Sequence, residues 1–330
     1  MNQPLSSAST LHVRPWLARL HPGLFAIPLG ILGLDGAWQH LAALPIRAAQ
    51  PTAKALLAGG LALLALLSLL WLGKALRHGS LLKREFFHPV QGPLLALWPV
   101  SILLAVSQLA PLYPGTKAGL LTATLLALLL QGMIAWQVVK QLATGQMPEE
   151  LVTPVLYLPI VPGGLVGAMA LAALDLHGFA MLLLGMGLGG WALLEMRILH
   201  RLFDGPLPLA LRPTLGIEMA PAAVATLAAS ALWPQLPAEI LVIGLGIACG
   251  PVVAVLTRWH WWSRTPFTFS FWSFSFPVAA LAAAIVEAVR RGGWPSEVAL
   301  AAVLLASLII AYLALRTLLL LLRGQLLPQN

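Results

Sequence analysis

The sequence has 330 residues, of which 59% are hydrophobic and 9% are charged, and its mean hydropathy is +0.89. These values lie far outside the range of soluble domains, so they exclude a water-soluble enzyme or binding domain as the main part of the chain. The formal net charge of +8 is spread between apolar runs rather than gathered on one face, which favours basic anchors at a membrane surface over a nucleic-acid partner.

Ten apolar stretches are each long enough to cross the roughly 30 Å hydrocarbon core of a bilayer as a helix. They lie at 23–42, 55–76, 92–110, 118–140, 155–174, 178–199, 215–233, 238–257, 268–289 and 298–321. Residues 1–22 form an N-terminal segment without the apolar core or cleavage site of a signal peptide, and 324–330 form a short tail. The sequence therefore predicts one ten-helix transmembrane domain over 23–323, with the lipid bilayer as its surroundings.

Lysine and arginine are distributed unequally between the two sets of loops. Fourteen of them, Arg14 included, lie on the side of both termini, and five lie on the opposite side. The five are Arg47, Lys54, Lys117, Arg290 and Arg291. Because positive residues near span ends are retained in the cytoplasm, we expect both termini to be cytoplasmic, in an inner or plasma membrane.

Prolines recur in the odd-numbered spans, at Pro28, Pro99, Pro159, Pro221 and Pro277, whereas the even-numbered spans hold one proline, in the eighth. Proline removes a backbone hydrogen bond and bends a helix, and a membrane tolerates this where protein or a water-filled cavity satisfies the freed carbonyl. The pattern predicts five hairpins of a kinked and a straighter helix, with the kinked helices in an inner ring around a central pore. The alternative is that these prolines only adjust packing.

Small residues accompany the prolines, notably Gly30 in the first span and Gly163 in the fifth. Small residues let helices approach closely, and around a central axis they also leave room for a solute. We therefore expect Gly30, Gly163 and the five prolines to line the pore.

Five motifs appear in order along the chain: LFAIPLGILGL at 24–34, TPVLYLP at 153–159, TLGIEMAPA at 214–222, FWSFSFP at 271–277 and RTLLLLLRGQLL at 316–327. Together they resemble the TehA tellurite-resistance and dicarboxylate transporter family, to which the plant guard-cell slow anion channels are similar. The resemblance extends from Leu24 to Leu327. It implies a homotrimer of ten-helix protomers, each with a pore for small anions.

The resemblance also assigns roles to two phenylalanines. In FWSFSFP the family's gating position matches Phe276, immediately before Pro277, and a hydrophobic constriction is a recognised gate. Phe25, in LFAIPLG, matches a further aromatic residue that lines the conduit. Without the resemblance, we would interpret Phe276 as an ordinary packed aromatic residue.

Carboxylates inside membrane spans are costly and are candidates for function. Asp35 and Glu218 belong to the inner spans and replace residues that are usually neutral in the family. Glu218 has three competing interpretations: it is paired or protonated against a neighbouring helix, it couples anion movement to proton uptake, or the cargo is not a simple anion. Glu195, in the sixth span, is expected to be structural, with Arg212 or a helix terminus as its partner.

Motifs for catalysis are absent from the sequence. The histidines have no metal-ligand spacing with acids, and there is neither a P-loop nor a dinucleotide-binding glycine motif, so we expect no enzyme activity, metal or cofactor. The leading hypothesis is a passive or proton-coupled conduit for small anions. The alternatives are a proton-coupled malate carrier or sulfite exporter and, from another class, a membrane scaffold that transports nothing.

Overall fold

The structure is a computed structural model that describes residues 15–327, and these residues form helices without strands. The α-helices are α1 (Ala26–Leu41), α2 (Ala49–Arg77), α3 (Gly79–Phe87), α4 (Gln91–Leu94), α5 (Leu97–Leu112), α6 (Lys117–Ala143), α7 (Tyr157–Ala173), α8 (His177–Asp204), α9 (Ala220–Leu232), α10 (Ala238–Thr257), α11 (Trp259–Trp262), α12 (Ser275–Gly292) and α13 (Ser296–Leu322). The predicted positions 1–14 and 328–330, including Arg14, lie outside the described residues.

Nine helical segments within 15–327 are long and apolar enough to cross a membrane. They correspond to the second to tenth predicted spans. The first predicted span, 23–42, is the 16-residue α1 with the preceding 3₁₀ segment Pro22–Phe25. Because 16 residues of α-helix rise about 24 Å, α1 alone is shorter than the hydrocarbon core. An all-helical membrane protein is therefore confirmed, with nine rather than ten segments of clear spanning length.

The nine segments fall into two groups according to how much of each is buried. Within the segments that contain α5, α7, α9 and α12, between 56% and 89% of the 18 most apolar consecutive residues are buried. For α2, α6, α8, α10 and α13 the buried share of the corresponding stretch is 17% to 28%. The second group therefore turns most of its apolar surface outward, as helices in contact with lipid do. The alternation follows the predicted order of inner and outer spans.

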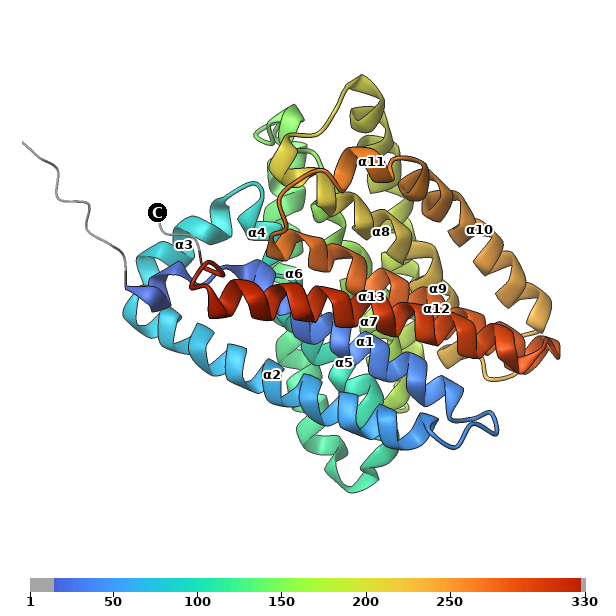
Figure 1. Cartoon of the computed structure of the whole chain (residues 1–330). Coiled ribbons are helices and arrows are strands. Elements are labelled where there is room, and N and C mark those ends of the chain that lie inside the picture. Colours follow the sequence, from blue (N-terminus) through green and yellow to red (C-terminus); the bar gives the residue numbers. More distant parts are fainter. Residues whose placement is uncertain (1–14, 328–330) are drawn as a thin grey trace, which may run out of the picture.

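The buried helices close a ring. α1 contacts α5, α5 contacts α7, α7 contacts α9, α9 contacts α12, and α12 returns to α1. The outer helices pack on this ring: α2 on α1, α6 on α5 and α7, α8 on α7, α10 on α9 and α12, and α13 on α12 and α1. In Figure 1, α13 crosses in front of the ring, and the two described chain ends lie on the same side, near α3.

The five predicted prolines mark the starts of the inner α-helices. Each is the second or third residue of its helix, where its missing N–H leaves no partner unsatisfied. Four of the helices continue directly from 3₁₀ segments, at Pro22–Phe25, Pro154–Leu156, Leu209–Met219 and Phe269–Phe274, and α5 follows the short α4. In four of the five inner helices the proline therefore lies close to a change from 3₁₀ to α-helical winding.

α1 and α12 approach each other closely at two glycines, Gly30 and Gly33. A Cβ atom at Gly30 would lie 2.2 Å from Oγ and 2.5 Å from Cβ of Ser275. A Cβ atom at Gly33 would lie 3.0 Å from Cδ2 of Phe276 and 3.2 Å from Cβ of Ala279. The absence of side chains at these two positions allows α12 to close the ring against α1.

We predict that Gly30→Ala destabilises the fold by about 1–3 kcal/mol, because the added methyl group collides with Ser275 and forces α1 away from α12. Thermal unfolding of the detergent-solubilised protein measures this. The control is Gly59→Ala in α2, where no heavy atom lies within 4 Å of an added Cβ and alanine favours the helix. Equal melting temperatures for the two variants would contradict the prediction.

Candidate functional site

Two cavities lie along the axis of the helix ring. The larger, of about 540 Å³, is lined by residues from α1, α5, α7, α9 and α12, mostly in their C-terminal halves. The smaller, of about 320 Å³, is lined mainly by the 3₁₀ segments and the first turns of the same helices. All five inner helices therefore contribute to both cavities, directly or through the segments that precede them.

Phe276 lies between the two cavities and lines both of them. It is the second residue of α12, next to Pro277, and 9% of its surface is exposed. Its ring lies against Gly33 of α1, where a side chain would take up the space that the ring occupies. Phe276 is thus the residue that the linings of the two cavities share, and it lies at the level where 3₁₀ winding changes to α-helix.

The other predicted lining residues occupy different positions. Pro277 lines the smaller cavity. Phe25 lies on the side of the helix ring that faces away from its axis. The centroid of its aromatic ring is 5.8 Å from those of both Trp71 and Trp98. Gly30 faces Ser275 of α12, and Gly163 faces Gln131 of α6, whose Cγ would lie 2.6 Å from an added Cβ. The remaining prolines, Pro28, Pro99, Pro159 and Pro221, are buried at the starts of their helices, outside the walls of both cavities.

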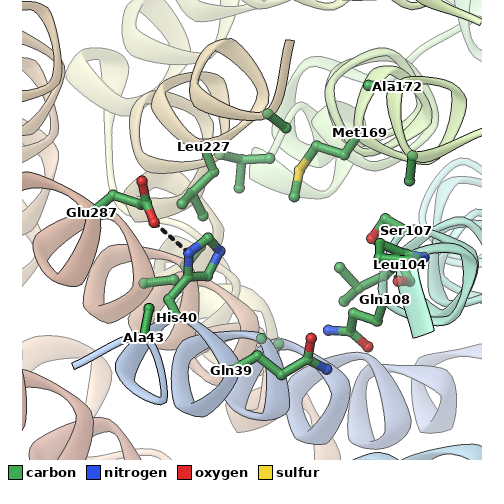
Figure 2. Close-up of a pocket in the computed structure, with 18 of the residues that line it drawn as sticks. Gln39, His40, Ala43, Leu104, Ser107, Gln108, Met169, Ala172, Leu227 and Glu287 are labelled. Carbon is green, nitrogen blue, oxygen red and sulfur yellow. Dashed lines mark hydrogen bonds and ion pairs between the residues drawn. The ribbon is translucent and has the colours of Figure 1, made fainter. Parts of the chain in front are cut away.

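An ionic cluster stands at the wall of the larger cavity. The Glu287 carboxylate accepts hydrogen bonds from Arg290 Nη2 at 2.8 Å and Arg291 Nε at 3.0 Å, and it lies 2.7 Å from His40 Nδ1. Arg291 also donates to Ser230 Oγ at 2.6 Å. Figure 2 shows Glu287 and His40 on one side of the cavity. Two guanidinium groups face one carboxylate, so the cluster carries a surplus positive charge.

The opposite side of the larger cavity carries amide and hydroxyl groups from Gln108 and Ser107, with Gln39 between the two sides (Figure 2). Gln108 Nε2 donates to the Leu32 carbonyl at 2.6 Å, and Gln39 Nε2 donates to Asp35 Oδ2 at 2.7 Å. Asp35 is fully buried, and among the described residues its Oδ1 has no hydrogen-bond partner. Asp35 therefore lies next to the cavity, linked to it through Gln39.

Glu218 is buried outside the walls of both cavities, where it shares a tyrosine with the half-buried Glu195. The Tyr157 hydroxyl lies 2.5 Å from Glu195 Oε2 and 3.2 Å from Glu218 Oε2, and Trp191 Nε1 donates to Glu195 at 2.8 Å. A phenol has one hydrogen to donate. If it goes to Glu195, the second contact is a hydrogen bond only when Glu218 carries a proton and donates it to the phenol oxygen. The geometry thus fits a protonated Glu218.

The expectation that Glu195 pairs with Arg212 or a helix terminus was wrong. Arg212 stacks over the Trp261 ring at 4.6 Å and donates to the Leu207 carbonyl at 3.3 Å, whereas the partners of Glu195 are Tyr157 and Trp191. Trp191 lies four residues before Glu195 on α8, at the spacing that brings side chains together on one helix face. That spacing was a sequence signal for the contact.

His21 lies at the wall of the smaller cavity, just before the first predicted span. Its Nδ1 accepts a hydrogen bond from the Gly23 N–H at 3.0 Å, and its ring centroid is 4.5 Å from that of Phe269. Burial, and to a lesser degree electrostatic repulsion from Lys74 and His88, lowers the pKa of His21 to about 4. The imidazole is therefore neutral near pH 7.

Comparison with known proteins gives two matches. A family model described as a voltage-dependent anion channel, SLAC1, matches residues 19–319. The tellurite resistance protein TehA homolog of Haemophilus influenzae is 28% identical over 307 residues, covering 93% of this chain and 92% of that protein. The family model spans the whole helix ring and both cavities.

We predict that His21→Asn reduces the acid sensitivity of the fold by roughly 1–3 kcal/mol between pH 7 and pH 4. The pKa of His21 falls from 6.5 in the unfolded chain to about 4 in the fold. The unfolded chain therefore binds an extra proton between these values, and acidification favours unfolding through this group. Asparagine retains an acceptor for the Gly23 N–H. Melting temperatures at pH 7 and pH 4.5 measure the effect.

The matched control is His177→Asn, at an exposed position at the start of α8. It is expected to lose as much stability on acidification as the wild type does. An equal acid effect in wild type and His21→Asn would show that His21 does not contribute to acid sensitivity.

Proposed function

This chain belongs to the SLAC1 family of voltage-dependent anion channels, and we propose that it moves small anions across a membrane along the axis of its inner helix ring. The observation that carries the proposal is the pair of cavities of about 540 and 320 Å³ that meet at Phe276. Two cavities on one axis that share a single lining residue suit a conduit in its closed state.

In this proposal Phe276 is the gate. An aromatic ring in a narrow tube excludes water and hydrated ions, and such hydrophobic constrictions control conduction in channels. The neighbouring backbone at Gly33 carries no side chain, so the ring rests directly against α1. Opening requires the ring to leave the axis by a change of its side-chain torsions or a shift of α12.

Two features support an anion as the permeant. Glu287 and Arg290 line the larger cavity, and Arg291 pairs with the same carboxylate, so the cluster has a surplus positive charge that would raise the local anion concentration there. On the other side of Phe276, the five inner α-helices begin near the smaller cavity, with the positive ends of their dipoles toward it. Discontinuous helices in transporters bind anionic groups in the same way.

The orientation, location and assembly belong to the same proposal. The excess of lysine and arginine on the side of the termini supports cytoplasmic termini in an inner or plasma membrane, with His21 and the smaller cavity on the cytoplasmic side. A homotrimer, in which each protomer has its own path, follows from the family resemblance.

A proton-coupled carrier, for example of a dicarboxylate such as malate, is the second candidate. The observation that favours it is the Tyr157 hydroxyl between Glu195 and Glu218, because this arrangement is suited to passing one proton between two carboxyl groups. Sulfite export is the corresponding proposal for an inorganic cargo. A scaffold without transport is disfavoured, because it predicts an axis filled by side chains rather than two cavities.

We expect Phe276→Ala to increase chloride and nitrate flux at least tenfold in proteoliposomes, because it removes the ring that separates the cavities. Light-scattering or ion-selective electrode measurements at matched protein density give the rates. The control is Phe179→Ala on the exposed face of α8, which should conduct like the wild type. The absence of anion flux in both wild type and Phe276→Ala, with folded protein in the vesicles, would overturn the channel proposal.

Proton coupling makes a separate prediction for Glu218→Gln, which keeps the shape of a protonated carboxyl group but cannot release the proton. If transport is coupled to protons through Glu218, anion-driven acidification of the vesicle interior is expected to be at least tenfold slower in Glu218→Gln than in the wild type. A pH dye enclosed in the vesicles measures this acidification. Glu239→Gln, in the first turn of α10, is the control and should behave like the wild type. Equal acidification in the wild type and Glu218→Gln would leave the passive channel as the better account.

A further inference from the structure

A third cavity, of about 500 Å³, lies outside the helix ring, in a groove between α10 and α13. Its floor is α12, at positions that include Leu281 and Ile285, and its walls come from α10 and α13. None of its lining residues belongs to either cavity on the ring axis. The groove is therefore a separate feature that faces the surroundings of the protein.

The groove is long, narrow and apolar. Along α13 its lining residues recur every three or four positions from Ala302 to Arg316, which corresponds to about 21 Å of helix axis. This length exceeds the roughly 15 Å thickness of one hydrocarbon leaflet. The side chains of α13 that line the groove are aliphatic except for Tyr312 and Arg316. Such a surface matches an extended hydrocarbon chain.

One end of the groove carries a guanidinium group. Arg316 lies six residues before the end of α13, and its Cζ is 4.8 Å from the centroid of the Phe267 ring. Its Nη1 donates to the Tyr312 hydroxyl at 2.8 Å. Among residues 15–327 no carboxylate forms an ion pair with it. A cation inside an apolar span is costly, so this position favours an anion as an additional partner.

Tryptophans stand at the same end of the groove. Trp259 and Trp262 line it, and Trp259 is half exposed. Tryptophan favours the level of the lipid headgroups, where its ring is in an apolar setting and its N–H reaches polar groups. The guanidinium group of Arg316 is therefore held near the depth at which a phospholipid phosphate lies.

We infer that the groove between α10 and α13 binds an anionic phospholipid, with an acyl chain along α12 and the headgroup phosphate on Arg316. The charges favour a lipid over a second copy of this chain. Arg258 and Arg264 lie in the segment that follows α10, so the same end of another copy would bring mainly positive charge to Arg316. An anionic lipid supplies both the apolar chain and the negative charge.

Native mass spectrometry of the detergent-purified protein tests this inference. The protein is titrated with phosphatidylglycerol and with phosphatidylcholine of the same acyl chains. We expect phosphatidylglycerol to bind at least fivefold more tightly to the wild type, and Arg316→Gln to weaken its binding about tenfold. The control is Arg323→Gln, two turns further along the same face of α13 and outside the groove, which should stay within twofold of the wild type.

A second variant, Leu305→Trp, tests the groove itself without altering its charge. Leu305 is exposed on the groove wall, so a larger side chain is accommodated by the fold but obstructs an acyl chain. We expect fewer tightly held lipids per protomer in the same spectra and an unchanged number of copies. Equal affinity for the two lipids, or equal effects of Arg316→Gln and Arg323→Gln, would overturn the inference. A change in the number of copies without loss of lipid would assign the groove to an interface between copies instead.

Discussion

The close packing of α1 against α12 is the constraint on which the rest of the structure depends. These two helices come from opposite ends of the chain, and their contact joins α5, α7 and α9 into a closed ring. It is possible because Gly30 and Gly33 leave room for Ser275 and Phe276. Gly33 permits the close approach of the two helices, and it also provides the surface against which the Phe276 side chain packs. The packing of the helix ring and the position of Phe276 between the two cavities thus depend on the same contact.

The winding of the inner helices changes close to Phe276. The switch from 3₁₀ to α-helix occurs close to a proline in four of the inner helices, and Phe276 precedes Pro277 at one of these switches. The 3₁₀ segments surround the smaller cavity, and the C-terminal halves of the α-helices surround the larger one. Each cavity therefore has its own backbone geometry and its own chemistry. The larger cavity carries an ionic cluster and amides among its apolar side chains, whereas the smaller is lined mainly by apolar and hydroxyl side chains.

Hydropathy and the proline pattern were sufficient to predict the class of fold and to separate inner from outer helices, because both depend on residue type along one helix. They did not show which face of a helix meets the axis, since that depends on packing between distant segments. Phe25, for example, lies against Trp71 and Trp98, and Gly163 faces α6. The contact between His40 and Glu287 joins residues 247 positions apart, which one sequence cannot predict. Phe276 was identified through the family resemblance, and its position between the cavities is consistent with that assignment.

The long 3₁₀ segment Leu209–Met219 has a mechanical consequence. Runs of 3₁₀ helix beyond three or four residues are uncommon because their hydrogen bonds are poorly aligned, and such stretches often act as hinges. This segment has 11 residues and forms part of the wall of the smaller cavity. The wall of the smaller cavity thus includes compliant 3₁₀ backbone, whereas the wall of the larger cavity is mainly α-helical. Strain applied to the inner ring would concentrate in this 3₁₀ segment rather than at the ionic cluster around Glu287.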